Sequence, residues 1–386
     1  MTYSKAGTRK VDHCDMAHNA NFSIFEDLLL VEPPLVHIPD VGYYSIYGAG
    51  ELGQLCLDLL LRLDKNVVNI YDHSNENAEI FRKRNQLQSA YDTGQDIPVI
   101  ACISKFPHHE VMHSIRELRI GAPINFYDFA DFFSERTSFQ NGWRFDGVSA
   151  SETIELKNLF KQLEDNTSVD HLFEFLHWHR LRRGSPIPSF NPEIQDVYFP
   201  HFLSSTLNSE ETFVDIGSHS GAVIAEFDRR MHGSYVNIFG IEPDPFNFSK
   251  AVNKLSNLDN RIRLIGAGVG AKTGLTSYAI GRNYLSAAAS ETGTLIPEFR
   301  LDDLGLSPSF LKVHTEGCEA KVLSAGIQTL QKHRPIIATT VYHRRRDLFE
   351  VAKLLFDQMP DYRFYFRCHS YVGASGVLYA LPKERF

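Results

Sequence analysis

Residues 213–221 read Phe-Val-Asp-Ile-Gly-Ser-His-Ser-Gly, a hydrophobic run that ends in a turn with two glycines. Glycine tolerates positive φ and lets the backbone approach a ligand closely, and a helix that begins there offers unpaired N–H groups. The next strand-like run ends at Glu242. An acid at a strand tip can bind the two hydroxyls of a ribose, as in nucleotide-binding sheets. The glycine spacing is not Gly-x-Gly-x-x-Gly, so it favours a ligand made of a nucleoside and an amino acid over a pyrophosphate.

Strand-like runs alternate with helical stretches after this turn. In the C-terminal half the expected strands are 212–216, 236–241, 261–265, 310–313 and 335–341. Such alternation predicts an α/β fold built on a parallel sheet. The last two strand-like runs, 363–367 and 376–381, have no helix-length segment between them, so we expect them to pair as an antiparallel hairpin.

A second glycine-rich turn lies near the N-terminus. Gly48, Gly50 and Gly53 form a complete Gly-x-Gly-x-x-Gly between the strand-like run 43–47 and an apolar helix, and Asp72 ends the following strand-like run. In this βαβ context the four residues predict a second nucleotide site, in a smaller Rossmann-like domain.

The length of 386 residues predicts two or three domains. We expect a tail and a short helix over 1–40, the nucleotide-binding-type domain over 41–135, a helical linker over 136–210 and a second α/β domain over 211–386. Within the first of these the short helix is expected around 22–31.

The formal net charge of -8 argues against a protein that binds nucleic acid or an anionic membrane surface. No apolar run reaches the roughly 18 residues of a membrane span, and the first residues, MTYSKAGTRK, lack the apolar core of a signal peptide. The five cysteines are scattered without Cys-x-x-Cys spacing, which indicates a reducing, cytoplasmic location. The sequence does not determine the oligomeric state and is compatible with a homo-oligomer.

Five ordered motifs in the C-terminal half resemble the FkbM family of S-adenosylmethionine-dependent O-methyltransferases. They are VDIGSHSG (214–221), IEPDPFNFSKAVNKL (241–255), LDDL (301–304), FLKVHTEGCEAKVLSAG (310–326) and RPIIATTVYH (334–343). The resemblance implies a Rossmann-like methyltransferase sheet whose last strand is antiparallel. It also implies methylation of a hydroxyl on a sugar, a polyketide or a related small metabolite, with S-adenosylmethionine as cofactor.

The resemblance also implies where the cofactor binds. The residues that it assigns to the cofactor are Asp215, Gly217, Ser218, Gly221, Glu242 and Pro243. Among these, Asp215, Gly217 and Gly221 line the methionine part and Glu242 holds the ribose. In the N-terminal half, IYGAGELG (46–53), VVNIYDHS (67–74) and IPVIA (97–101) resemble the N-terminal Rossmann-like domain of sugar-modifying enzymes such as sialic-acid-type O-acetyltransferases. That resemblance implies a nucleotide or nucleotide sugar as the second ligand.

One departure from the FkbM pattern concerns the acceptor side of the site. The family usually has aspartate where this chain has His314, while Glu316, Gly317 and Glu319 match. His314 and His343 end two neighbouring strands, so both face the crevice in which such sheets bind ligands. We therefore take His314, Glu316 and His343 as the candidate catalytic residues.

Three interpretations of His314 compete. The imidazole, with an ordinary pKa near ~6.5, could accept a proton from the acceptor hydroxyl as the methyl group transfers. It could join His343 and Glu316 around a divalent metal, because imidazole and carboxylate suit several metals. It could also be a satisfied polar residue in a site that has lost its usual acid. In that case the chain would be a non-catalytic nucleotide-binding sensor or scaffold, which is the alternative to the methyltransferase.

Three further patterns are weaker. Residues 109–113 match His-Glu-x-x-His, but the match falls on a crossover helix without a third ligand, so it does not predict a metal site. The aromatic and basic run 171–183 predicts a helix packed between domains. Residues 344–346 are three arginines that could hold a phosphate or carboxylate, and 281–286 is a loop expected over the site.

Overall fold

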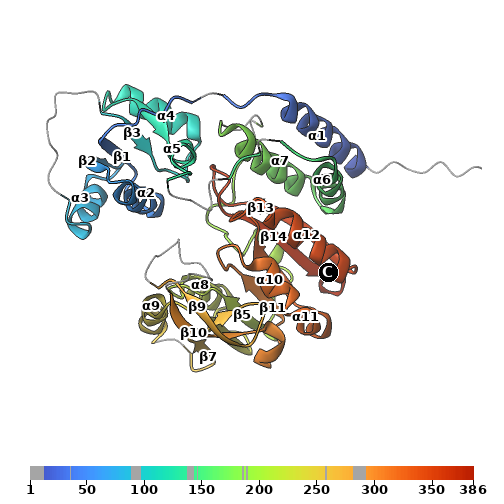
Figure 1. The fold of residues 1–386 in the computed structure, drawn as a ribbon. Helices are drawn as coiled ribbons and strands as arrows, with labels where there is room; N and C mark the ends of the chain where they lie inside the picture. The colour runs from blue at the N-terminus through green and yellow to red at the C-terminus, as the bar shows by residue number, and fades with distance from the viewer. Residues whose placement is uncertain are drawn as a thin grey trace, which may run out of the picture.

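The computed structural model describes residues 13–34, 36–87, 97–136, 143–145, 147–184, 187, 190–256, 259–280 and 293–386, and it describes only the backbone of residues 13–21. Two α/β units and a group of helices make up this part of the chain (Figure 1).

A seven-stranded sheet forms the core of the C-terminal unit. Its strands are β5 (Thr212–Ile216), β6 (Asn237–Ile241), β7 (Ile262–Ile265), β11 (Phe310–Val313), β12 (Ile336–Thr340), β13 (Tyr362–Cys368) and β14 (Gly376–Pro382). The order across the sheet is β13-β14-β12-β11-β5-β6-β7. The strands β5, β6, β7, β11 and β12 are parallel to one another, while β14 runs antiparallel to both β12 and β13. The structure thus confirms the predicted methyltransferase-type sheet with an antiparallel last strand.

Both faces of this sheet are covered, which explains why its central strands β5, β11 and β12 are almost entirely buried and mostly apolar. The helices of this unit are α8 (Ala222–Met231), α9 (Pro245–Leu255), α10 (Glu319–Ser324), α11 (Ile327–His333) and α12 (Asp347–Gln358), with short 3-10 turns at His201–Leu203, Leu301–Leu304 and Lys383–Arg385. One face packs Phe213, Ile238 and Phe310 against α8 and the segment 198–203. The other face packs Val214 and Leu311 with α10 and α12.

The N-terminal unit has a four-stranded parallel sheet. Its strands are β1 (Tyr43–Tyr47), β2 (Asn66–Tyr71), β3 (Val99–Ala101) and β4 (Pro123–Asn125), in the order β2-β1-β3-β4. Its helices are α2 (Glu51–Arg62), α3 (Asn75–Arg84), α4 (His108–Glu117) and α5 (Phe126–Phe132). This arrangement is the predicted smaller Rossmann-like unit.

Three further helices join the two units. They are α1 (His13–Leu30), α6 (Ala150–Gln162) and α7 (Asn166–Leu181), and α1 begins well before the expected residue 22. On α7, Phe175 packs against Phe366 of β13 with ring centroids 5.4 Å apart, while Trp178 packs against His108 of the N-terminal unit at 5.3 Å. Residues 171–181 of the run 171–183 therefore lie in a helix packed between two units, as the composition predicts.

A three-stranded sheet was not expected from the sequence. It consists of β8 (Gly268–Val269), β9 (Gly274–Tyr278) and β10 (Thr294–Phe299), in the order β8-β10-β9. These strands are short, β10 contains Pro297, and several of their side chains face solvent. Proline within a run argues against a strand, so the local pattern gave no strand signal. The sheet lies beside β7 in Figure 1. Among the described residues, the structure contains no helix with the length and apolar character needed to cross a bilayer.

Replacing Phe213 by alanine should lower the free energy of unfolding by about 3–5 kcal/mol, because it removes a fully buried ring. The Phe213 ring lies 4.5 Å from that of Phe227 and 5.0 Å from that of Phe310, so rigid neighbours surround the cavity that would remain. Urea unfolding measures the loss. The control is Phe106→Ala, the same change at a side chain that is 59% exposed, and it should cost less than about 0.5 kcal/mol. Equal costs for the two variants would contradict the prediction.

Candidate active site

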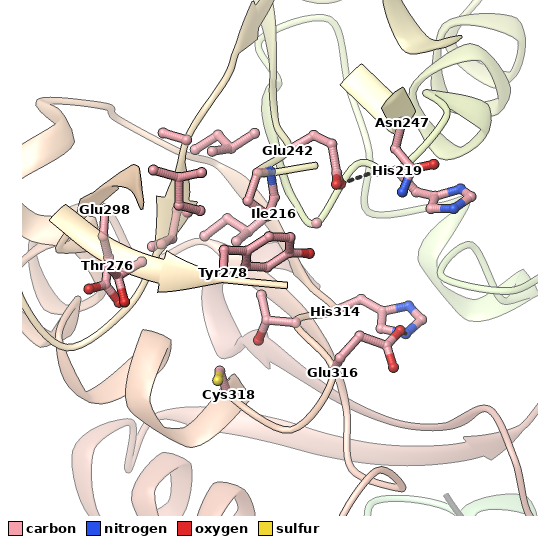
Figure 2. Close-up of a pocket in the computed structure, with 18 residues that line it drawn as sticks. Ile216, His219, Glu242, Asn247, Thr276, Tyr278, Glu298, His314, Glu316 and Cys318 are labelled. Carbon is pink, nitrogen blue, oxygen red and sulfur yellow. Dashed lines mark hydrogen bonds and ion pairs between the residues drawn. The ribbon is translucent and has the colours of Figure 1, made fainter. Parts of the chain in front are cut away.

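A cavity lies at the carboxyl ends of β5, β6 and β11, where open α/β sheets bind their ligands. The seven-stranded sheet contributes one wall, which comprises Ile216, Gly217, His219, Ile241, Glu242, Pro243, Asn247, His314, Thr315, Glu316 and Cys318. The small sheet and the segment leading into it contribute the other wall, which comprises Ala267, Gly268, Val269, Thr276, Tyr278, Ile296 and Glu298. Figure 2 shows Tyr278 between Glu242 on one side and His314 with Glu316 on the other.

The glycine turn after β5 packs directly against the turn after β11. Gly217 has φ +76°, and a Cβ on it would stand 1.9 Å from the backbone oxygen of His314. The N–H groups of Gly217 and Ser218 both donate to the carbonyl of Ile241, at 2.9 and 3.1 Å. Gly221, with φ +74°, begins α8 and packs against Leu255. Only glycine fits at Gly217, because the turn and the neighbouring strand end leave no room for a side chain.

Asp215 and Ser218 lie beneath this turn rather than at the cavity wall. Asp215 is fully buried and forms an ion pair with Lys312 of β11, with 2.8 Å between Oδ1 and Nζ. Lys312 Nζ also donates to the carbonyl of Gly217 at 2.7 Å. Ser218 is buried, and its hydroxyl has no hydrogen-bond partner among the described residues. Asp215 therefore supports the turn from below, and a direct contact with the cofactor stays a prediction.

Glu242 stands at the tip of β6 and lines the cavity. Its Oε2 accepts from the N–H of His219 at 2.8 Å, and its Oε1 accepts from the N–H of Asp244 at 3.0 Å. Each oxygen keeps a second lone pair with which it can accept from a ligand hydroxyl. Burial raises the pKa of Glu242 to about 6, although the two N–H donors oppose this shift. Pro243 follows at the wall and leads into Asp244, which caps α9.

The three candidate catalytic residues lie together. His314 Nε2 is 3.2 Å from His343 Nε2 and 3.3 Å from Glu316 Oε1, and His343 Nε2 is 3.4 Å from Glu316 Oε2. The Tyr342 hydroxyl lies 3.3 Å from His314 Nε2. The side chains of His314 and Glu316 are each 25% exposed, whereas His343 is fully buried. His314 and Glu316 therefore present polar atoms to the cavity, with His343 behind them.

Glu319 holds this cluster in place from within the protein. Its carboxylate accepts from the N–H groups of Thr315 and Gly317 at 2.8 and 2.9 Å, and from the Thr340 hydroxyl at 2.9 Å. Its Oε1 also lies 3.0 Å from Nδ1 of His343. Burial opposes the imidazolium form of His343, but the charges of Glu319 and Glu316 raise its pKa above the ordinary value.

The pKa of His314 shifts in the opposite direction. Burial lowers the pKa of this imidazole, and the carboxylate of Glu316 only partly opposes the shift. The Nδ1 atom of His314 is 2.6 Å from the Tyr198 hydroxyl. The two histidines of the cluster are therefore biased differently: His314 toward the neutral form and His343 toward the charged form.

Sequence reasoning missed two groups of residues. The sequence did not indicate Lys312 or Tyr198 as site residues. A single lysine inside the apolar strand β11 and a tyrosine some way before β5 are compatible with many structures. The residues that the small sheet contributes to the cavity are Thr276, Tyr278, Ile296 and Glu298. For Ile296 and Glu298 the signal would have been the alternation of buried and exposed side chains in β10, which Pro297 obscured; Thr276 and Tyr278 lie in β9, which has no such alternation.

The second glycine turn forms as predicted. The N–H of Gly48 donates to Tyr71, and a Cβ on Gly53 would stand 2.0 Å from the carbonyl oxygen of Gly48. The helix α2 begins after Gly50. The carboxylate of Asp72 is bound within the protein: it accepts from the N–H of Ala49 in the glycine turn at 2.8 Å and from the N–H of Ser74 at 3.0 Å. Binding of a nucleotide or nucleotide sugar in this unit stays a prediction.

The weaker patterns have structural roles. Arg344 pairs with Asp347, and Arg345 and Arg346 pair with Glu152 of α6. Arg345 and Arg346 therefore connect the start of α12 with α6, Arg344 pairs with the first residue of α12, and phosphate binding by the three stays a prediction. In the pattern 109–113, His113 pairs with Glu117 on the surface of α4, and no metal-ligand group forms there among the described residues. The loop 281–286 lies outside the described residues.

Residues 215–371 match the family model of the methyltransferase FkbM domain. The chain therefore carries an FkbM-type methyltransferase domain, as the five motifs predict. The crystal structure of methyltransferase FkbM from Methylobacillus flagellatus KT is similar over 95% of this chain and 99% of that chain, with 19% identity and a TM-score of 0.61. At this identity the likeness shows the fold, and it includes the N-terminal unit.

More distant structures also match. Precorrin-6y C5,15-methyltransferase from Geobacter metallireducens GS-15 shares 16% identity over 46% of this chain and 83% of that chain, with a TM-score of 0.30. A SAM-dependent methyltransferase from Aquifex aeolicus shares 14% identity over 50% of this chain and 98% of that chain, with a TM-score of 0.27. Both are too distant to support an argument. No curated protein matches the sequence.

Replacing Gly217 by alanine should weaken the binding of S-adenosylmethionine at least tenfold, because the new methyl group collides with the backbone of His314. Gly233→Ala is the matched control: Gly233 has φ +70°, and no described atom lies within 4 Å of an added Cβ. In both variants an alanine at positive φ destabilises the backbone by about 1–2 kcal/mol, but only Gly217→Ala also deforms the turn. Calorimetric titration measures the affinity. Similar affinities for the two variants would contradict the prediction.

Proposed function

We propose that the FkbM-type domain transfers the methyl group of S-adenosylmethionine to a hydroxyl of a sugar or related small metabolite. The observation that carries the proposal is the shared cavity: Glu242 lines one part of it, and His314 and Glu316 line another. One part suits the cofactor's ribose, and the other suits removal of a proton from the acceptor.

The residues at the cavity fit this cofactor. Glu242 is a buried carboxylate that keeps acceptor capacity toward the cavity, as two vicinal ribose hydroxyls require. Apolar side chains from both sheets, Ile241, Val269 and Ile296, would pack against a flat base. The glycine turn at Gly217 lets the methionine part approach the backbone. When bound, the cofactor supplies an already activated sulfonium, so the protein's task is to align the reacting atoms and exclude water.

The polar groups around the cavity favour a hydroxylated acceptor. An alcohol oxygen must lose its proton as it attacks, and a positioned base can contribute 10²–10⁴-fold to such a step. His314 and Glu316 line the cavity, with His343 behind them, and these titratable side chains can assist the loss of this proton. On the opposite wall, Thr276, Tyr278 and Glu298 offer donors and acceptors suited to the other hydroxyls of a sugar.

Binding of S-adenosylmethionine should weaken as the pH falls through about 6, because Glu242 then becomes protonated and no longer accepts from both ribose hydroxyls. With a pKa of about 6, Glu242 is mostly charged at pH 7.5 and mostly protonated at pH 5. The dissociation constant of S-adenosylmethionine at pH 5 should therefore be about tenfold that at pH 7.5. Titration calorimetry at several pH values measures this change.

In Glu242→Gln the affinity should be lower and should no longer depend on pH over this range. NAD serves as the control ligand. Binding of NAD without binding of S-adenosylmethionine would overturn the cofactor assignment. A pH-dependent affinity that survives in Glu242→Gln would show that another group causes it.

Replacing His314 by alanine should reduce turnover at least 10²-fold while the affinity for S-adenosylmethionine changes less than about threefold. The reason is that His314 contacts the acceptor side of the cavity and not the ribose site at Glu242. The control is His113→Ala, at a side chain that is 67% exposed on α4, and it should leave both quantities unchanged. Release of S-adenosylhomocysteine in the presence of sugar acceptors measures turnover. Unchanged turnover in His314→Ala would remove this cluster from the reaction.

A further inference from the structure

We propose that His314, Glu316 and His343 bind one divalent transition-metal ion at the cavity wall, and that this ion binds the acceptor hydroxyl. The metal site is inferred from the geometry of the three side chains. Its role toward the acceptor rests on the proposed methyl transfer.

The separations between the three side chains are those of atoms that share an ion. With bonds of about 2.1 Å and angles between tetrahedral and octahedral, two ligand atoms on one metal stand about 3.0–3.4 Å apart. The two Nε2 atoms of His314 and His343 are 3.2 Å apart, and each lies 3.3 or 3.4 Å from an oxygen of Glu316. Two imidazoles and one carboxylate on one face are a known ligand set for divalent metals.

The same contacts are poor hydrogen bonds. Protein N–H···O bonds are shortest and strongest near 2.9 Å, and one proton can serve only one of several acceptors. Around His314 Nε2, the contacts to His343, Glu316 and Tyr342 all measure 3.2 or 3.3 Å. Four polar groups thus converge at a distance that is long for hydrogen bonds and right for ligands of a common cation.

The opposite ring nitrogens make close contacts of ordinary hydrogen-bond length. His314 Nδ1 lies 2.6 Å from the Tyr198 hydroxyl, and His343 Nδ1 lies 3.0 Å from the Glu319 carboxylate. Histidines that bind a metal usually donate their other N–H to a carboxylate or similar group, which fixes the ring and the tautomer. His314 has such a hydrogen-bond partner in Tyr198, and Nδ1 of His343 faces the Glu319 carboxylate in an ion pair, so both Nε2 atoms are oriented toward the shared point.

A neighbouring group of ligand-type side chains does not compete for the ion. Glu319, His343 and Asp347 also lie close together, but all three are fully buried. Glu319 already accepts from two backbone N–H groups and a hydroxyl, and Asp347 accepts from the backbone and side chain of Arg344. Most of their acceptor capacity is used inside the protein, and none of the three residues lines the cavity, so this group orients His343 and offers no open position to an acceptor.

The ligand set and its exposure define the ion and its open positions. Imidazole nitrogen suits iron, nickel, copper and zinc, whereas magnesium and calcium prefer oxygen ligands and manganese accepts them readily. Three protein ligands leave at least one coordination position free, as in catalytic metal sites. His314 and Glu316 are partly exposed to the cavity, so the free positions face the space in which the acceptor would stand.

The ion would change how the acceptor is activated. Bound to the metal, the acceptor oxygen loses its proton to solvent more readily, because the ion stabilises the negative charge. That oxygen then forms a bond to the methyl carbon while the carbon–sulfur bond breaks. The electron pair of that bond stays on sulfur, and the products are the methyl ether, S-adenosylhomocysteine and one proton. In this reaction His314 is a metal ligand rather than the base itself.

The test measures metal binding directly, without an acceptor. Full-length protein is stripped with a chelator, dialysed and titrated with Co²⁺, followed by visible absorption, and with Zn²⁺ and Mn²⁺, followed by calorimetry. We expect one ion per chain and no comparable binding of Mg²⁺ or Ca²⁺. His314→Ala and Glu316→Gln should each weaken binding at least tenfold, while His113→Ala should bind as the unchanged protein does. Affinity for S-adenosylmethionine shows that each variant is folded.

Two outcomes would overturn the metal site: no stoichiometric binding, or binding that His314→Ala and Glu316→Gln leave intact while the proteins stay folded. The proposed methyl transfer fails separately. If stripped protein in excess chelator still transfers methyl groups at the full rate, the metal's role is wrong and the methyltransferase function stands. If Co²⁺ binds as expected but no acceptor hydroxyl is methylated with any of the metals, the metal site stands and the proposed function fails.

Discussion

The buried ion pair between Lys312 and Asp215 is the interaction on which the site depends. The two residues are directly opposite each other on the parallel strands β11 and β5, and neither is exposed beyond 2%. Removing two charges from water is costly, and removing only one partner of such a pair typically costs 3–5 kcal/mol, because an uncompensated charge remains. Lys312 offsets this cost partly by donating to the carbonyl of Gly217 as well. A single ammonium thus fixes both the strand pair and the glycine turn at Gly217.

The same lysine connects the glycine turn with His314 on the other side of the cavity. Its Nζ lies 5.2 Å above the ring of Tyr198, and the hydroxyl of that tyrosine contacts His314. Gly217 in turn packs against the backbone of His314 with no space for a methyl group. The position of the His314 imidazole is therefore tied to the glycine turn by two routes, one through side chains and one through backbone. This coupling suits a reaction that depends on aligning two substrates, because small displacements of either would misalign the transferred methyl group.

Much of the fold followed from the sequence because its signals are local. The strand ending at Asp215 and Ile216, the glycine turn and the tip at Glu242 each occupy a short segment with its own pattern, and the absence of a helix between 367 and 376 predicted the final hairpin. The small sheet was missed since β9 and β10 pair residues about 20 positions apart, contain a proline and expose many side chains. Val269 of β8 packs into the main hydrophobic core, a long-range contact that no local pattern records. For the same reason Thr276, Tyr278 and Glu298 could not be proposed as site residues.

By itself the sequence determined the class of sheet, the glycine turn after its first strand, and the identity of His314, Glu316 and His343 as the unusual polar group, because these depend on residue type and order along the chain. Only the tertiary structure decided what those residues do together. Asp215 lies under the turn because its partner Lys312 comes from a strand almost a hundred residues away. His314 and His343 present their Nε2 atoms to one point because Tyr198 and Glu319, from two further segments, hold the opposite ring nitrogens. Side-chain orientation is set by packing between distant parts of the chain, and spacing in the sequence does not encode it.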